Sequence, residues 1–303
     1  MTELTVFQRE INPLLPNVEL RFNEPMSSHT SFRIGGPCEI MAFPKDKEQL
    51  AQVLKVSKLL DIPFVILGAG TNVLAPDAGI SGLVICLKDC MDGMEVLDDT
   101  HIRIYSGVTM TRAAIFAANH GLSGLEFAHG IPGTVGGGVY MNAGAYGGEI
   151  CQVCTQVEAM DYAGNVRIFS NEEMEFSYRH SILEEQAYIV ISADFALVPS
   201  DPETVKAKHK ELQAKRSASQ PLDLPSAGSA FKRPVGGYAA ALIDQAGLKG
   251  YQVGGAAIST KHAGFAVNVG GATAEDVRNL LSQVSDIVLR NSGIRLEPEV
   301  RIW

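Results

Sequence analysis

Hydrophobic residues follow a helical spacing in some stretches of this chain. In residues 46–60 the apolar positions fall near one face, which predicts an amphipathic helix. Thr273 and Asp276 form a capping-box pattern before a long amphipathic stretch that stops near Gly293. Further helices are predicted at 110–120, 201–218 and 238–246, and a short helical turn is predicted to begin at Asn171.

Short apolar runs predict the strands. They lie at residues 62–67, 82–87, 102–106, 153–161, 166–169, 187–197 and 264–269, and residues 299–303 alternate like a strand. Ala163, Gly164 and Asn165 separate two of these runs, which predicts a hairpin. Because strands and helices mix without a regular β-α-β rhythm, we predict an α+β fold, with a domain boundary near residues 199–201.

A glycine turn follows the strand predicted at residues 62–67. Its sequence, GAGTN from Gly68, is half of a dinucleotide-binding fingerprint, but Val73 stands where the third glycine belongs. Residues 74–79 contain a proline and cannot open a helix. The pattern therefore excludes the usual dinucleotide fold and leaves open a loop whose backbone donors hold a phosphate.

Residues 128–149 are the most unusual stretch of the chain. Eight glycines lie between Gly130 and Gly148, with the polar residues Thr134 and Asn142 and no charged side chain. Ordering so many glycines is costly, because glycine loses more backbone freedom on folding than any other residue. Two explanations stay open: a ligand that contacts the backbone directly, or tight turns under a sheet.

Charge is distributed unevenly. The whole chain has a formal net charge of −9, yet residues 205–303 hold thirteen Lys and Arg against eight Asp and Glu, a net of +5. This asymmetry indicates that the last third meets an anion, although a lysine-rich helix around residues 206–210 explains part of it. No basic groove interleaved with aromatic residues is present, so nucleic acid is not an expected partner.

The remaining composition is that of a globular protein with room for two domains. Residues 1–16 lack the basic and apolar segments of a signal peptide, and no apolar run is long enough for a membrane span. Five scattered cysteines suit a reducing cytoplasm. Cys151 and Cys154 form a single CxxC in a strand-like sequence, so we expect no metal site.

Six separated motifs together resemble the UDP-N-acetylenolpyruvoylglucosamine reductase (MurB) family. They are GAGTN at Gly68, the glycine-rich stretch from Gly130 to Glu149, YRHS at Tyr178, PSAGSAFKRP at Pro225, KHAGF at Lys261 and EPEVRIW at Glu297. They cover nearly the whole chain in the family's order. No insertion with an extra tyrosine follows YRHS, so the chain is similar to the shorter class of the family.

The resemblance implies a domain plan. An FAD-binding fold of the vanillyl-alcohol oxidase (PCMH) type, made of two α+β subdomains at about 1–88 and 89–200, would precede an α+β substrate domain at 201–303. The terminal strand would return to the active site. The resemblance further implies a cytoplasmic oxidoreductase of peptidoglycan synthesis, needed for cell wall biogenesis, cell shape and division, with no obligate protein partner and no membrane attachment.

The family's reaction implies roles for three residues. NADPH reduces noncovalently bound FAD, and the hydride then reaches the enolpyruvyl double bond of the UDP-sugar to give UDP-N-acetylmuramate. Arg179 resembles the arginine that holds the carboxylate and the developing enolate. Glu299 resembles the family's glutamate, which helps only when protonated or through a bridging donor. Ser229 resembles the proton donor, a role that requires a site without water.

Each of these residues has a structural alternative. Ser229 between small residues is typical of a turn, and Glu299 is compatible with a solvent-facing strand position. Arg179 is compatible with a structural ion pair to Glu173 or Glu175.

The resemblance also implies the binding residues. For FAD these are Gly68, Ala69, Gly70, Thr71, Asn72, Val73 and Leu74 at the pyrophosphate, and Gly130, Pro132, Gly133, Thr134, Gly137, Asn142, Ala143, Gly144 and Ala145 around the ribityl chain and ring. Arg216 and Arg301 resemble the residues that hold the UDP diphosphate, and Lys232, Arg233, His262 and Tyr178 are further candidates. His262 is also compatible with a packed loop.

Two positions depart from the family pattern. Ala227 and His129 stand where cysteine is common, and neither change removes chemistry. His129 raises the alternative of a covalent flavin, which the family's noncovalent binding disfavours. A flavin oxidase that uses oxygen and a non-catalytic nucleotide-sugar sensor are the rival functions.

Overall fold

The computed structural model describes residues 6–303, so the first five residues, part of the stretch considered for a signal peptide, lie outside it. The chain forms two compact units. Unit 1 comprises the residues up to Phe22, Glu39–Ala69 and Ser81–Lys215, and unit 2 comprises Asn23–Cys38, Gly70–Ile80 and Arg216–Trp303. Two short segments of the first 80 residues thus group with the C-terminal part of the chain. The domain boundaries near residues 88 and 200 stay a prediction.

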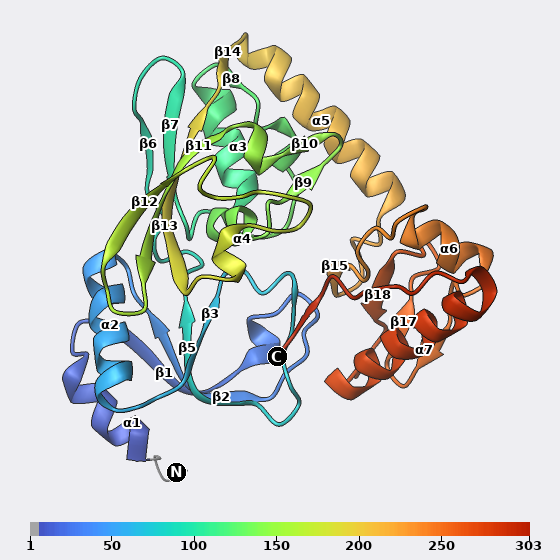
Figure 1. Cartoon of the computed structure of the whole chain (residues 1–303), viewed down its shortest axis with the longest axis horizontal. Coiled ribbons are helices and arrows are strands. Elements are labelled where there is room, and N and C mark those ends of the chain that lie inside the picture. Colours follow the sequence, from blue (N-terminus) through green and yellow to red (C-terminus); the bar gives the residue numbers. More distant parts are fainter. Residues whose placement is uncertain (1–5) are drawn as a thin grey trace. The chain divides into compact units, whose positions relative to one another are not determined.

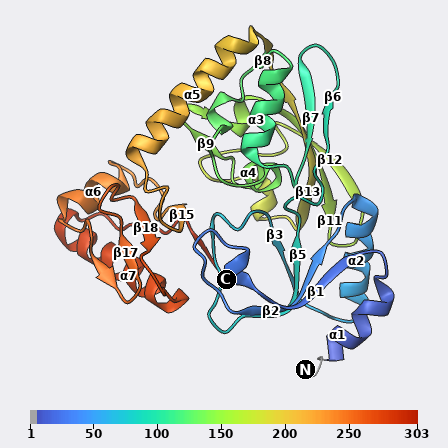
Figure 2. The ribbon, with the colours of Figure 1, turned by 180° about the vertical axis from the view of Figure 1, so that it is seen from behind.

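A four-stranded sheet lies mainly in unit 1. Its order is β1-β2-β5-β3, with β1 at Glu19–Pro25, β2 at Pro37–Phe43, β3 at Phe64–Leu67 and β5 at Ile80–Cys86. Helix α1 (Val6–Ile11) and helix α2 (Lys47–Leu59) belong to this part of unit 1 (Figure 2). The predicted helix at 46–60 is confirmed as α2, which begins after Asp46 because the Asp46 carboxylate accepts a 2.7 Å bond from the Gln49 amide. Leu50, Val53 and Leu54 bury its apolar face.

A five-stranded sheet forms the second half of unit 1. Its order is β12-β11-β13-β7-β6, with β6 at Met94–Val96, β7 at His101–Tyr105, β11 at Cys154–Asp161, β12 at Val166–Ser170 and β13 at Tyr188–Ala196. The predicted hairpin is confirmed as the antiparallel pair β11-β12. Helix α3 (Met110–Asn119) and helix α4 (Val135–Tyr140) lie beside this sheet in Figure 1, and their apolar residues share one core with its strands.

One prediction in unit 1 was wrong in detail, and the prediction of a short turn from Asn171 was confirmed. The strand-like sequence around the CxxC begins as a 3-10 helix, η4 (Ile150–Gln152), because Glu149 and Gln152 form a capping box there. The helical turn expected from Asn171 stays a single turn, since Glu175 has a φ of 47° and ends it. The other short elements are η1 (Asn12–Leu14), η3 (Glu126–Ala128), η5 (Ile182–Glu184), β8 (Leu122–Ser123), β9 (Gly144–Ala145), β10 (Gly148–Glu149) and β14 (Val198–Pro199).

Unit 2 contains a second four-stranded sheet. Its order is β15-β18-β17-β16, with β15 at Ser226–Ser229, β16 at Gln252–Val253, β17 at Ala256–Ile258 and β18 at Phe265–Asn268. Helix α6 (Ala239–Gln245) and helix α7 (Ala274–Ser292) pack with this sheet in one apolar core (Figure 1). The predicted polar helix is confirmed as α5 (Pro202–Ser219), along which the chain passes from unit 1 to unit 2.

Helix α7 has the predicted ends and one unexpected contact. Thr273 and Asp276 form the capping box, and Gly293 ends the helix with a φ of 74°. Asp77 adds a second cap, because its two carboxylate oxygens accept bonds of 2.8 and 3.2 Å from the amides of Ala274 and Glu275. The segment after Leu74 therefore opens no helix of its own, as predicted, and instead caps a helix far along the chain.

The remaining elements of unit 2 are short. They are η2 (Met26–Ser28) and the parallel pair of β4 (Val73–Leu74) with β19 (Arg301–Ile302). The strand predicted at 299–303 thus forms over two residues. Within residues 6–303, no helix combines the length and the apolar character needed to cross a bilayer.

Candidate active site

Ser229 lies at the end of β15, where the strand is irregular. Ser226 pairs with Val267 and Ser229 pairs with Phe265, and the register shifts between the two pairs. Gly228 has a φ of 73° in this bulge. A bulge re-aims the side chains around it. Ala227 and Ala230 are buried in the core of unit 2, whereas Ser229 is exposed and available to a ligand.

Glu299 lies on the segment next to the Ser229 strand. Its amide donates a 3.0 Å bond to the carbonyl oxygen of Ala230, the residue after Ser229. A bridge between Phe231 and Pro298 continues the pairing. Glu299 is half-buried. The structure therefore brings together two of the three residues for which the motifs predict catalytic roles.

The loop at 70–74 contacts the same terminal segment. The Asn72 side chain donates a 3.3 Å bond to the Glu299 carbonyl oxygen. The carbonyl oxygens of Asn72 and Leu74 accept bonds of 2.9 and 3.1 Å from the amides of Arg301 and Trp303. Arg301 thus lies beside the glycine loop, and the terminal segment lies between this loop and the strand of Ser229.

The loop also suits an anionic group on electrostatic grounds. Carbonyl oxygens repel phosphate, and those of Gly70, Asn72 and Leu74 all accept bonds from protein amides. Gly70 has a φ of 61°, and a Cβ there would lie 2.0 Å from the His29 carbonyl oxygen. Only glycine fits this position. The residues present therefore fit the pyrophosphate of a dinucleotide cofactor.

The glycine-rich stretch is partly helical, which the sequence analysis did not predict. Thr134 caps α4 by accepting a 3.3 Å bond from the Gly137 amide. A Cβ on Gly136 would lie 2.8 Å from the Ser106 Cβ, and one on Gly138 would lie 2.7 Å from the Met110 sulfur. These two glycines serve close packing inside unit 1. Gly136 and Gly138 therefore have a structural role and not a ligand-binding one. They serve this role in a helix, where the structural alternative had predicted tight turns.

Other glycines of the stretch leave space for a ligand. A Cβ on Gly137 would meet a single neighbouring atom at 3.6 Å, and one on Gly147 would meet nothing within 4 Å. Gly68 lies beside this helix, since its Cβ would come within 2.7 Å of the Thr134 hydroxyl oxygen. Two separate predicted cofactor segments therefore meet in unit 1.

Asn142 is fully used by the protein. It is buried, and its amide nitrogen donates bonds of 2.9 Å to the Glu149 carboxylate and to the Ser177 carbonyl oxygen. Its oxygen accepts a 3.0 Å bond from the Cys151 amide. The side chain thus ties the glycine-rich stretch to the YRHS segment.

Arg179 lies in that YRHS segment of unit 1. One guanidinium nitrogen donates a 3.3 Å bond to the Gly144 carbonyl oxygen, and its Cζ lies 5.0 Å from the Tyr178 ring centroid. Its φ of 55° is unfavourable for a residue with a side chain. Glu173, one of the two carboxylates considered as its structural partner, pairs with Arg167 at 2.8 Å.

The predicted substrate residues of unit 2 have protein contacts of their own. Lys232 pairs with Glu297 at 2.6 Å, and the Arg233 guanidinium lies 4.3 Å from the centre of the Tyr238 ring. Arg216 is buried near the end of α5.

His262 packs within its loop. Its Nδ1 accepts a 3.1 Å bond from the Gly264 amide, its ring meets Phe265 edge-on, and burial lowers its pKa. These contacts match the packed-loop alternative for His262.

Sequence reasoning missed two groups that shape unit 2. The Lys261 ammonium donates a 2.6 Å bond to the Ser217 carbonyl oxygen beside Arg216. Asn268 is buried, and its side chain donates to the Phe32 carbonyl oxygen at 3.0 Å. For Asn268 the only sequence signal was a polar residue near the end of an apolar strand, whereas Lys261 opens the KHAGF motif, which gives no sign of its partner.

The cysteines show no sign of activated thiols. All five are free, and burial raises the pKa of Cys154 to about 12 and also raises the pKa of Cys151. Because thiolate is the metal-binding and nucleophilic form, this CxxC is poorly suited to either role.

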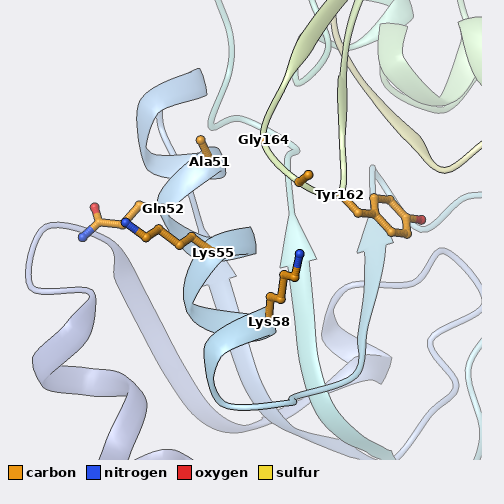
Figure 3. Close-up of a pocket in the computed structure, with 7 residues that line it drawn as sticks. Ala51, Gln52, Lys55, Lys58, Tyr162 and Gly164 are labelled. Atoms are coloured by element: carbon orange, nitrogen blue, oxygen red, sulfur yellow. The ribbon is translucent and has the colours of Figure 1, made fainter.

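A surface hollow of unit 1 has none of the predicted site residues in its lining. Its volume is about 530 Å³, and it lies between α2 and the turn of the β11-β12 hairpin (Figure 3). Its lining residues are Ala51, Gln52, Lys55, Lys58, Tyr162, Ala163 and Gly164. This hollow therefore contributes nothing to the candidate active site.

Comparison with known proteins identifies the family. Residues 38–170 match the family described as FAD binding domain, and residues 220–303 match UDP-N-acetylenolpyruvoylglucosamine reductase, C-terminal domain. The reductase of that name from Caldanaerobacter subterraneus is 45% identical over 97% of this chain and 96% of its own length. The one from Agathobacter rectalis is 44% identical over 98% of both chains.

A solved structure supports the same relationship. The crystal structure of UDP-N-acetylenolpyruvylglucosamine reductase (MurB) from Thermus caldophilus superposes with a TM-score of 0.79 at 33% identity. The match covers 95% of this chain and 99% of that one. The predicted fold class, an FAD-binding fold followed by a C-terminal α+β domain, is confirmed, and so is the resemblance carried by the six motifs. The chain belongs to the UDP-N-acetylenolpyruvoylglucosamine reductase family.

Proposed function

We propose that this chain is an FAD-dependent oxidoreductase that reduces UDP-N-acetylglucosamine enolpyruvate to UDP-N-acetylmuramate with NADPH. The reaction belongs to peptidoglycan precursor synthesis in the cytoplasm. Family membership supports the reaction. The observation that carries the chemistry lies within unit 2, where the exposed Ser229 and the half-buried Glu299 lie on adjacent segments beside the loop at 70–74.

We assign the cofactor to the FAD-binding region, residues 1–200, and the UDP-sugar chiefly to residues 201–303. Noncovalent FAD would accept hydride from NADPH and supply it to the terminal enolpyruvyl carbon. Residues 68–74 would hold its pyrophosphate. The glycine-rich residues Gly130, Pro132, Gly133, Thr134, Gly137, Asn142, Ala143, Gly144 and Ala145 would surround the ribityl chain and ring, with Asn142 contributing through its backbone because its side chain is used within the protein.

Ser229 supplies the proton in this mechanism. Hydride addition leaves negative charge on the carbon next to the carboxylate, and that carbon must be protonated for the reaction to finish. A serine hydroxyl is a weak acid, so it needs a strongly basic carbanion and exclusion of water. Ser229 is exposed at the end of β15, next to the irregularity at Gly228, where its hydroxyl can reach a ligand.

Arg179 and Glu299 stabilise the negative charge that develops on the substrate during hydride addition. The guanidinium of Arg179 is always charged and matches a carboxylate in a bidentate fashion. A left-handed backbone at a residue with a side chain is a form of strain that collects at functional sites. Glu299 assists as a protonated acid or through a bridging donor, since a bare carboxylate would repel the enolate.

The diphosphate of the substrate would be held by Arg216 and Arg301. Arg301 follows Glu299 by two residues on the terminal segment, and its amide donates a 2.9 Å bond to the carbonyl oxygen of Asn72 in the loop at 70–74. Tyr178, Lys232, Arg233 and His262 are supporting candidates. The Lys232 and Arg233 side chains would have to exchange their present partners for the ligand.

The two half-reactions test the proposal separately. Ser229→Ala should leave reduction of bound flavin by NADPH within about twofold of the parent rate, and should slow reoxidation by the enolpyruvyl substrate by about 10²–10⁴-fold. Ser292→Ala is the matched control and should change neither rate, because Ser292 is the last residue of α7 and its hydroxyl donates to the Val288 carbonyl oxygen of the same helix. Stopped-flow absorbance of the flavin gives both rates. Equal slowing of the two half-reactions would exclude Ser229 as the proton donor, and a purified protein without flavin would contradict the function itself.

A further inference from the structure

Ser31 connects the loop at 70–74 to the strand of Ser229. Its hydroxyl donates a 2.5 Å bond to the carbonyl oxygen of Ser226 in β15 and lies 3.3 Å from the Gly70 carbonyl oxygen. Its amide donates a 3.0 Å bond to the same Gly70 oxygen. A hydroxyl carries a single hydrogen, so the shorter contact is the main bond and the longer one shares it.

The neighbours of Ser31 hold it rigidly. Thr30 is buried, and its hydroxyl donates a 2.8 Å bond to the Ile34 carbonyl oxygen. Phe32 is buried in the core of unit 2, and its carbonyl oxygen accepts the bond from Asn268. Because both flanking residues are anchored, the backbone of Ser31 cannot move away from β15 without disturbing the core.

The same loop is attached to the second catalytic segment two residues further on. Asn72 donates its side-chain amide to Glu299 and accepts from the Arg301 amide. The loop is therefore linked at Gly70, through Ser31, to the Ser229 strand, and it is bonded at Asn72 to the Glu299 segment. The position of the loop therefore sets the distance from each of these two segments to the group that the loop binds.

We propose that Ser31 is a positioning residue that couples cofactor binding at the loop to the placement of Ser229. This inference rests on the proposed function for the identity of the cofactor and of the proton donor. Ser31 itself supplies no proton to the substrate. Its hydroxyl fixes the position of β15 relative to the loop. The Ser229 hydroxyl therefore keeps a constant distance from FAD bound at the loop.

The first test is hydrogen exchange with and without FAD. In the parent chain, adding FAD should slow amide exchange both at 70–74 and at 226–229, because the two segments are linked. In Ser31→Ala the slowing should persist at 70–74 and be lost at 226–229. Ser28→Ala, an exposed serine in the same segment, is the control and should behave as the parent chain. Full FAD-dependent slowing at 226–229 in Ser31→Ala would overturn the proposal.

The second test separates positioning from general damage. Ser31→Ala should slow reoxidation by the enolpyruvyl substrate by about 10–100-fold, as expected for a small misplacement of a reacting group, while reduction by NADPH stays within about twofold. Ser31→Thr, which keeps the hydroxyl, should recover most of the rate. Equal slowing of both half-reactions, or no recovery with threonine, would contradict the inference.

The outcome also distinguishes the inference from the proposed function. If the parent chain fails to bind FAD, the proposed function is wrong. The mechanical link is then judged from exchange at 226–229 without any ligand, which should be faster in Ser31→Ala than in the parent chain if the link exists and unchanged if it does not.

Discussion

Gly70→Ala is the sharpest test of the loop geometry. Gly70 has a φ of 61°, and an added Cβ would lie 2.0 Å from the His29 carbonyl oxygen and 2.9 Å from the Thr30 Cα. Both neighbours are backbone atoms, so they cannot rotate away as a flexible side chain would. The loop or the segment at 29–30 must shift, and either shift disturbs the amide bond from Ser31 to Gly70.

The magnitude follows from two contributions. A left-handed backbone costs a residue with a Cβ about 1–2 kcal/mol relative to glycine. Overlap in a well-packed region adds about 1–3 kcal/mol. Gly247→Ala isolates the first contribution, because Gly247 has a φ of 71° in the same unit and an added Cβ there would meet nothing within 4 Å.

Thermal unfolding of the two variants measures the difference. Gly70→Ala should lower the apparent midpoint by roughly 2–12 °C more than Gly247→Ala does, from about 2–4 °C per kcal/mol for a chain somewhat shorter than this one. It should also weaken FAD binding, measured by flavin fluorescence titration, whereas Gly247→Ala should not. Equal losses of stability in the two variants would refute the close approach of Gly70 to His29.

Three further predictions concern unit 1. Asp194→Ala should lower the free energy of unfolding by about 3 kcal/mol, as measured by urea unfolding. The reason is that the partly exposed Arg103 and the Gln156 amide both lose their buried carboxylate partner. A loss below about 1 kcal/mol would contradict this expectation. His129 and His209 stack with ring centroids 4.4 Å apart, and burial lowers the pKa of both. As the pH falls below about 6.5, these two histidines therefore take up protons in the unfolded chain before they do so in the folded chain, and the free energy of unfolding decreases. His209→Phe should make the free energy of unfolding depend less on pH between about pH 7 and 5. An unchanged pH dependence would count against the stack. Thr134→Ala should cost about 1 kcal/mol through loss of the α4 cap, while Thr134→Ser should retain it, as compared by thermal unfolding; equal midpoints for the two would contradict the cap.

Local signals in the sequence determined much of the fold. Asp46 and Thr273 accept bonds from amides three residues later, and Gly293 ends α7 by its own backbone conformation. The hairpin around Gly164 is likewise a matter of neighbouring residues. These features were predictable because each depends on groups within one turn of the chain. The six motifs identified the family for a different reason, since they carry chemistry in a fixed order.

Only the tertiary structure decided the features that join distant segments. Glycine spacing did not reveal that Gly136 and Gly138 serve helix packing, since that depends on Ser106 and Met110. No local pattern marked Asp77 as the second cap of α7.

The arrangement around the candidate active site belongs to this second class. No motif pointed to Ser31, whose role arises from bonds to residues 39 and 195 positions away. Helix caps and hairpins depend on residues a few positions apart in the sequence. The placement of Ser229 and Glu299 beside the loop at 70–74 depends instead on which surfaces pack together. That choice is made by the core of unit 2 as a whole.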